Sequence, residues 1–520
     1  MKRRLISSVL ALCLLLGCLG CQSEGDALYS QLVEERVAQL PPSPEPGSWR
    51  YLNRTPEPGD TLQGEITLRG FWQDNWDAHI ECLAREFMSR HPAVKVNIQW
   101  EFGFWDLSKV TKEDQWAARD AFFEEMRVDM ASGMADYIFY DNENGGLNVP
   151  ALSTSGVLED FGPFLRNTPE FSQDTFYQPV LEVFQVDGRQ TVLPQSFTYS
   201  AICFDRKLLE SIGVDPDSIR FVSTTQVMEW YQRAREQNPE LGLFFNSPSV
   251  DQMFFLERTA YMDLMDRTCT FASQPFVDYL TKLLDIQNEE PDLSPELTGR
   301  YSLVPYAIEA LRYQYTGRYG AYYTLYEEEN EDVIQAFTRS KPFFAVLHDA
   351  RPSALLTQYK PLEYLAGPYP LTNSKGQQGI GTNEAFIMPS CLQNKELAWE
   401  FIKYCLSDRE EPRLVEEGYP WYYTYDFPIN CHNMRTMAED ASDGTGFSMV
   451  EDGFVTSVWQ MDVDEYMGLV DEVLSRSPVA VEYYNVDAQE FIDEFYLNRL
   501  TTPEECAEKI QGRATIQLNE

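Results

Sequence analysis

A chain of 520 residues in which 43% are hydrophobic is long enough to build two or more domains, each around a substantial core. Its 82 acidic residues far outnumber its 41 basic ones, and the formal net charge is −41. A field of this sign repels phosphate backbones, so the composition argues against nucleic acid as a partner.

The N-terminus carries three cations, Lys2, Arg3 and Arg4, followed by an apolar run over residues 5–16 that ends in small residues and cysteines. The run is too short for a stable membrane span, so residues 1–20 are predicted to be an export signal that is removed. The segment that ends at Cys18 resembles the lipobox of bacterial lipoproteins, and the one that ends at Cys21 is followed directly by polar residues. Either cysteine could carry the lipid. The alternatives are an ordinary secretory signal or a redox CxxC pair.

Residues 21–61 are predicted to form a tether, with a short helix possible over residues 28–40. Closely spaced prolines favour an extended chain and cannot build a core. The prolines are Pro41, Pro42, Pro44, Pro46, Pro56 and Pro58. Such a tether would hold a folded body away from the outer face of the membrane to which the lipid attaches.

Little in the sequence indicates a metal or a cofactor, and we expect neither. The cysteines after Cys21 form no CxxC pairs, their number is odd, and only four histidines occur in the chain. Serine-hydrolase, P-loop, dinucleotide and HExxH motifs are absent. The acidic stretches 141–146 and 440–444 lack the alternation of a calcium loop and are predicted to be solvated turns.

From residue 65 the pattern is that of an α/β domain. Ile66 and Leu68 alternate with polar residues, a helical stripe runs from Trp76 to Phe87, and residues 94–100 alternate strictly as in a strand. A second helix should end at Gly133, before a third strand over residues 137–140. The repeated β-α-β order predicts parallel strands with right-handed crossovers.

Ligands of such sheets lie beyond the carboxyl ends of the strands. Here those ends carry aromatic and polar residues, over residues 70–74 and 140–144. Sugar rings stack on indole and phenol groups, and carboxylates and amides bind the hydroxyls. The alternative is that Trp72 and Tyr140 simply cap the core.

The order of several short segments resembles the bacterial extracellular solute-binding proteins of family 1, the sugar ABC-transporter lipoproteins that include maltose-binding protein. The segments that carry the resemblance are 87–96, 130–137, 187–194, 204–214, 337–347, 379–381, 394–402 and 502–505. No single segment is specific, but their order and spacing extend over roughly residues 65–512.

The resemblance implies an α/β fold of type II, the periplasmic-binding-protein fold. Each of two lobes would be a mainly parallel sheet flanked by helices, with the ligand cleft at the hinge. The N-terminal lobe would hold residues 62–194 and 355–418, and the C-terminal lobe residues 195–354 and 419–520. A first crossing between the lobes is expected at Leu193–Pro194.

Matching the segments places candidate ligand contacts after the strand ends, after the first crossing, in a turn of the second lobe and near the last crossing. They are Trp72, Asp74, Trp76, Tyr140, Asp141, Tyr199, His348, Arg351, Trp421 and Tyr422. A solvated loop is the alternative for His348. A cluster that only packs the hinge is the alternative for Trp421 and Tyr422.

The resemblance therefore implies a monomeric, lipid-anchored receptor that captures a small solute, an oligosaccharide first of all, and hands it to an ABC-transporter permease. It would not be an enzyme. The main alternative is a lipid-anchored glycoside hydrolase or polysaccharide-processing enzyme, whose signature would be a pair of carboxylates. With 82 acids, accidental pairs are inevitable, so Asp74 and Asp141 alone do not indicate one. A structural or adhesive surface lipoprotein is a third class.

Overall fold

A computed structural model describes the chain from residue 54 to residue 519, with internal gaps. The described residues are 54–73, 78–103, 112–141, 146–172, 174–244, 248–264, 266–287, 343–350, 365–382, 384–408, 426–442, 450–451, 454–455, 463–484, 486 and 488–519. Within them, no helix is long and apolar enough to cross a membrane. Cys18 and Cys21 lie outside the described residues.

The first sheet has five strands in the order β2-β1-β3-β15-β6. Their bounds are β1 Gly64–Gln73, β2 Val94–Gly103, β3 Ile138–Asp141, β6 Val192–Pro194 and β15 Ala385–Ile387. β1 pairs in parallel with β2 and with β3, which confirms the parallel β-α-β prediction. β15 is antiparallel to both of its neighbours.

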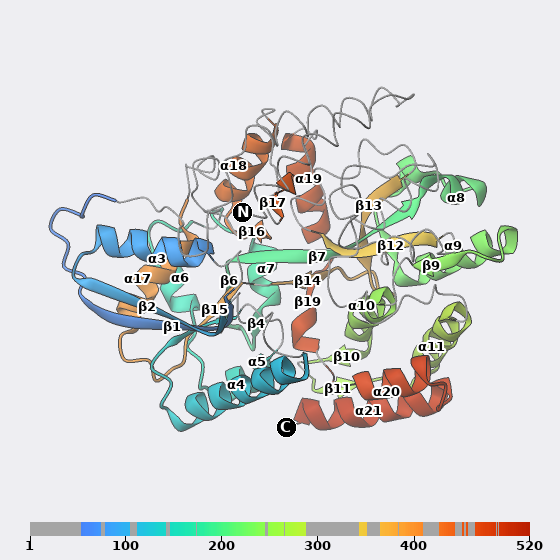
Figure 1. Ribbon diagram of the computed structural model, residues 1–520, viewed down its shortest axis with the longest axis horizontal. Coiled ribbons are helices and arrows are strands. Elements are labelled where there is room, and N and C mark those ends of the chain that lie inside the picture. Colours follow the sequence, from blue (N-terminus) through green and yellow to red (C-terminus); the bar gives the residue numbers. More distant parts are fainter. Residues whose placement is uncertain are drawn as a thin grey trace, which may run out of the picture.

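Helices cover this sheet on both sides (Figure 1). Their bounds are α3 Ala78–Arg90, α4 Lys112–Ser132, α5 Val149–Ser155, α6 Gly162–Asn167, α7 Gln178–Val183 and α17 Lys395–Leu406. α4 ends directly before Gly133, whose φ of +73° fits the glycine stop expected from the sequence. α3 and α17 pack together through Phe87 and Phe401, whose ring centroids lie 5.5 Å apart.

The second sheet is built around the long strand β7, which runs across the middle of the molecule (Figure 1). Its main path is β19-β14-β7-β12-β9, and β13, β8 and β16 join beside it. The bounds are β7 Ser196–Asp205, β8 Val222–Ser223, β9 Gly242–Phe244, β12 Phe343–Ala350, β13 Leu365–Thr372, β14 Gly379–Gly381, β16 Phe427–Pro428 and β19 Val479–Ala480. β7 is antiparallel to its partners, whereas β12 with β9, β13 with β8 and β14 with β19 are parallel.

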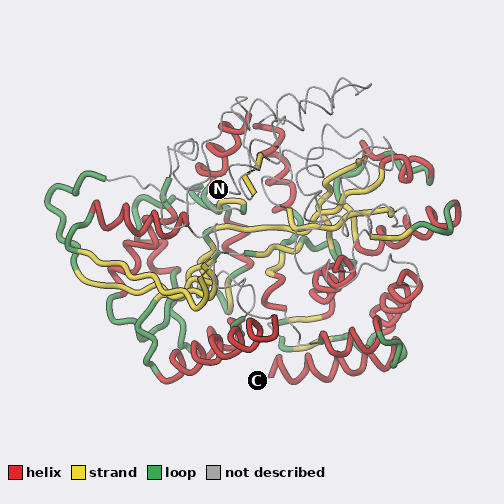
Figure 2. Tube along the Cα trace, in the orientation of Figure 1, coloured by secondary structure: helices red, strands yellow, loops and turns green. Residues whose placement is uncertain are grey.

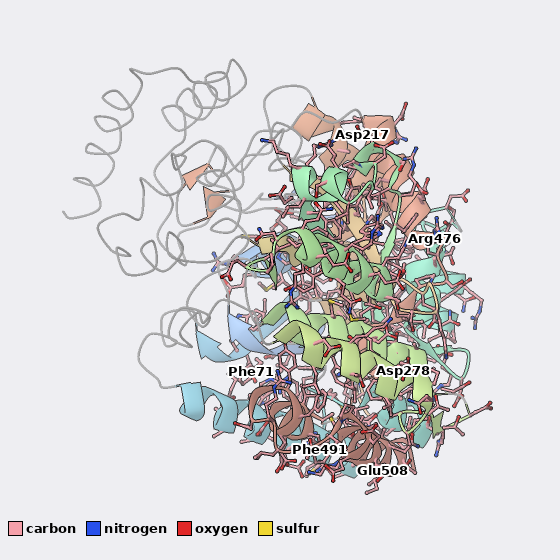
Figure 3. All side chains as sticks on the ribbon, turned by 90° about the vertical axis from the view of Figure 1, so that its right-hand side faces the viewer. Phe71, Asp217, Asp278, Arg476, Phe491 and Glu508 are labelled. Atoms are coloured by element: carbon pink, nitrogen blue, oxygen red, sulfur yellow. The ribbon has the colours of Figure 1, made fainter. Side chains whose placement is uncertain are left out.

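A second set of helices packs on this sheet, and Figure 3 looks onto that side of the molecule. Their bounds are α8 Arg206–Ser211, α9 Thr224–Gln237, α10 Pro248–Glu257, η3 Arg258–Tyr261, α11 Gln274–Gln287, α20 Gln489–Ile492 and α21 Pro503–Asn519. Ser223 and Gln226 form a complete capping box at the start of α9. Two hydrophobic cores result, one under each sheet.

The remaining elements are short strands, short 3-10 and π-helices, and the longer helices α18 and α19 (Figure 2). Their bounds are β4 Gln185–Val186, β5 Arg189–Gln190, η2 Pro216–Ser218, β10 Met262–Asp263, β11 Thr268–Cys269, α18 Cys431–Ser442, β17 Val450–Glu451, β18 Phe454–Val455, α19 Val463–Leu474, η5 Val481–Tyr484 and η6 Asp493–Leu497.

The division of the chain differs from the expected one in two places. β13 was expected in the first lobe, but it pairs with β7 and β8 of the second sheet, so the chain returns to the first sheet only at β15. α18 and α19 were expected in the second lobe. Their buried side chains, among them Met434 and Tyr466, belong to the first core, because they pack on the segment that carries Phe427.

The expected tether also ends earlier than residue 61. The backbone amide of Arg54 donates to Ser89 Oγ (2.9 Å), and that of Glu57 donates to the Arg90 carbonyl (3.1 Å). His91 Nδ1 lies 3.0 Å from Asp60 Oδ2. The pKa of Asp60 is lowered chiefly by the hydrogen bond from the backbone amide of Leu62, and His91 lowers it further. Residues 54–63 therefore dock on the C-terminal end of α3, and the prediction of a tether applies to the residues before them.

Candidate functional site

The carboxyl edge of the first sheet is where the sequence places the ligand contacts. β1 ends with Trp72 and Gln73, and β3 ends with Asp141, which is half-buried. β1 and β3 are parallel, so the ends of both strands lie at one edge of the sheet. The backbone of Trp72 is described but its side chain is not, and Asp74 and Trp76 lie outside the described residues.

Tyr140 occupies the last buried position of β3. Its ring lies 5.2 Å from that of Phe386 and 6.3 Å from that of Trp100, between centroids. Gly70 makes room for this group, because a Cβ at Gly70 would overlap the Trp100 ring. The phenol hydroxyl donates to Gln195 Oε1 (3.1 Å) and lies 3.4 Å from His79 Nε2. Tyr140 is fully buried, so its ring belongs to the core in this conformation.

His79 and Glu384 extend this polar group. His79 lies at the start of α3, and Glu384 directly precedes β15; His79 Nε2 is 3.6 Å from Glu384 Oε1. We call Tyr140, His79, Gln195 and Glu384 the junction cluster. Its members expose at most 5% of their surface, so no substrate can reach them in this conformation. Among the described residues, no three His, Cys, Asp or Glu side chains lie close enough together to hold a metal ion.

Tyr199 lies in β7, shortly after the first crossing. Its ring stacks on Phe427 with a centroid distance of 5.4 Å and an interplanar angle of 16°. It is 1% exposed, and burial raises the pKa of its hydroxyl. The structure therefore places Tyr199 in an aromatic stack between β7 and β16, separate from the rings around Tyr140.

The other candidates are placed only in part. His348 lies in β12, where it pairs with Ala201 of β7, but its side chain is not described. Arg351, Trp421 and Tyr422 lie outside the described residues. The assignment of ligand contacts therefore stays a prediction, in which Tyr140 and Asp141 are the two candidates that the structure brings together at one strand end.

Sequence reasoning missed His79, Gln195 and Glu384 as members of one group. Two of them directly precede or follow buried strands: Gln195 comes after β6, and Glu384 comes before β15. The available signal in the sequence was a polar residue next to an apolar strand segment. The sequence did not indicate that residues 79, 195 and 384 lie close together, because only the order of strands in the sheet brings them together.

No family model and no curated protein matches this chain at the level of sequence. Solved structures do match. An ABC substrate-binding protein from Listeria monocytogenes in complex with cycloalternan has a TM-score of 0.52 at 14% identity, with 88% of this chain and 100% of that chain covered. An extracellular solute-binding protein of family 1 from Alicyclobacillus acidocaldarius has a TM-score of 0.52 at 15% identity, covering 89% and 100%.

A solved structure described as a de novo designed esterase also has a TM-score of 0.52, at 11% identity, covering 88% of this chain and 99% of that chain. At identities this low, structural similarity establishes a fold and does not establish an activity or a ligand. The chain has the two-lobed periplasmic-binding-protein fold, as the sequence predicted.

Proposed function

We propose that this protein is a lipid-anchored extracellular solute-binding protein that captures a solute, an oligosaccharide first of all, for an ABC importer. The observation that carries the proposal is the arrangement of the two sheets. Strands cross between them at the carboxyl edge of the first sheet, where β1 and β3 end in aromatic and acidic residues. A solute held there between two lobes would stabilise a closed form, and a permease could recognise that form.

The proposed contacts are the candidates that follow strand ends and crossings. Trp72 and Trp76 would stack on sugar rings, and Asp74 and Asp141 would bind hydroxyls. His348, Arg351, Trp421 and Tyr422 would contribute from the second lobe and the last crossing. Tyr140 and Tyr199 are buried, so we assign them to the walls beneath the solute.

The proposed anchor is the lipid on Cys21 or Cys18, which would keep the receptor on the extracellular face of the membrane, near its permease. The docking of residues 54–63 on α3 supports a folded body that includes these residues. Residues 21–53 would then form the proline-rich tether. The large negative charge would keep the body away from anionic headgroups.

The alternative is a glycoside hydrolase built on the same fold. It would need two carboxylates on either side of a reachable bond. The buried acid at the junction, Glu384, is 5% exposed and lies beside His79, so it cannot act as an acid or a nucleophile on a glycan in this conformation. This observation favours binding over hydrolysis at the junction.

Isothermal titration of the mature chain against a panel of neutral oligosaccharides tests the proposal. We expect one or more glycans to bind without being cleaved. The Trp72→Ala variant should lower their affinity at least tenfold, which corresponds to about 1.4 kcal/mol. Trp230→Ala is the matched control, because Trp230 packs on Phe204 in the second lobe, and it should leave affinity unchanged. Glycan turnover by the pure protein, or no binding to any member of the panel, would contradict the proposal.

A further inference from the structure

The junction cluster lies where the chain passes between the two sheets, and the backbone of Gln195 is the meeting point. Gln195 separates β6 from β7, and its amide donates to the Glu384 carbonyl (2.8 Å), directly before β15. The Gln195 carbonyl accepts from the amide of Ile429 (3.1 Å), which follows β16. Gln195 therefore lies in one connecting segment and bonds to two others.

The segments stay paired on both sides of this point. Pro194 pairs with Ala385 in the first sheet, and Tyr199 pairs with Ile380 in the second. β16 joins β7 through Phe427 and Phe197. A change in the angle between the lobes would therefore alter the bonds that Gln195 makes to its two backbone partners.

Side chains connect this meeting point to the strand ends that carry the proposed solute contacts. The Gln195 side chain accepts from Tyr140, the neighbour of Asp141 in β3. Tyr140 in turn lies next to His79, at the start of the helix that follows β1, and His79 lies next to Glu384. The ends of β1 and β3 are thus linked to two of the connecting segments by buried polar contacts.

We propose that the junction cluster positions the connecting segments, so that contact between a solute and the ends of β1 and β3 biases the angle between the lobes. Tyr140, His79, Glu384 and Gln195 are positioning residues in this account and do not touch the solute. The role of the junction cluster in closure rests on the proposed function. The mechanical link itself can be tested without any solute.

The test compares two substitutions that each remove one buried phenol hydroxyl. Tyr140→Phe removes the hydroxyl that contacts Gln195 and His79 and keeps the ring. Tyr369→Phe is the matched control, because its hydroxyl donates to the Pro216 carbonyl (2.8 Å) inside the second lobe. Both tyrosines are buried.

Hydrogen exchange of the solute-free mature protein is the first measurement. We expect amides over residues 195–199, 379–382 and 427–430 to exchange about tenfold faster in Tyr140→Phe and at the wild-type rate in Tyr369→Phe. Exchange that is unchanged, or that rises equally in both variants, overturns the inference. If Tyr140→Phe does not fold, His79→Gln serves as the second variant with the same expectation.

Titration with maltotriose as the probe is the second measurement. If the wild type binds, Tyr140→Phe should weaken binding about tenfold and Tyr369→Phe should not; equal affinities in all three proteins would overturn the inference. If the wild type does not bind maltotriose or any other glycan of the panel, the proposed function fails. The exchange measurement then decides the inference by itself.

Discussion

Two buried polar groups, one at the junction and one inside the second lobe, are bonded in different ways. In the junction cluster the side-chain distances are 3.1, 3.4 and 3.6 Å. In the second lobe, Glu257 accepts from Thr224 Oγ1 (2.6 Å) and from the amide of Ser374 (2.9 Å), and it also bonds to the Ser374 hydroxyl. The two distances to Glu257 are at most 2.9 Å, whereas these three contacts of the junction cluster are all at least 3.1 Å.

The difference follows from where the partners come from. Glu257 ends α10, and its partners lie at the first residue of α9 and in the turn after β13, all within one lobe. The junction cluster takes its side chains from α3, β3 and the connecting segments. If the lobes close as proposed, contacts within one lobe would keep their partners, whereas contacts at the junction would have to rearrange.

The largest expected effect comes from Asn373→Ala in the second lobe. Asn373 is fully buried, donates to Thr259 Oγ1 and Gln377 Oε1 (both 2.9 Å), and accepts from the amides of Lys375 (2.9 Å) and Gln377 (3.0 Å). Removing the amide leaves several buried groups unsatisfied and should lower the free energy of unfolding by about 3 kcal/mol. Urea denaturation measures this loss.

Gln195→Ala is the matched truncation at the junction. Its side chain accepts the hydrogen bond from Tyr140, so the loss should be about 1 kcal/mol. Equal losses in the two variants would show that the junction is as rigid as the lobe, and the comparison between the two groups would then be wrong.

At Glu257 we expect an effect between those at Asn373 and Gln195. Glu257→Ala removes the acceptor for Thr224 and Ser374 but also relieves the burial of an acid, so it should cost about 2 kcal/mol at neutral pH. Glu257→Gln should be close to wild type, because its amide oxygen can accept from Thr224 and from the Ser374 amide while its nitrogen donates to the Ser374 hydroxyl. Unfolding of both variants in urea distinguishes the loss of bonding from the loss of charge. A Gln variant as unstable as the Ala variant would contradict this account.

Much of the first lobe could be predicted from the sequence, because its elements carry clear periodicity. Residues 94–100 alternate strictly and form β2, and the helical stripe that ends at Phe87 forms α3. β6 ends at Pro194, where the sequence predicts the first crossing, and β7 of the second sheet begins after Gln195.

The lobe membership of β13, α18 and α19 could not be predicted in this way. Their apolar faces fit either core, and only the pairing of β13 with β7 and the packing of Tyr466 near Phe427 decide between them. The junction cluster was missed for the same reason. Single polar residues at positions 79, 195 and 384 have no periodicity, and only the sheet order brings them together.

The smallest expected effect is a difference between the wild type and Glu257→Gln in how their stability depends on pH. Burial raises the pKa of Glu257 above its ordinary value of 4.5, although the hydrogen bonds from Ser374 and Thr224 and the charge of Lys375 oppose this. Between 4.5 and the raised value the folded protein binds more protons than the unfolded chain, so this group's contribution to stability is complete below pH 4.5 and is lost as the pH rises through the folded pKa. The wild type should therefore gain stability relative to Glu257→Gln as the pH is lowered from 7 towards 4.5, in thermal unfolding of both proteins across that range. Parallel curves would contradict this account, because they would mean that the hydrogen bonds to Glu257 fully offset its burial and that the second lobe holds this acid ionised as readily as water does.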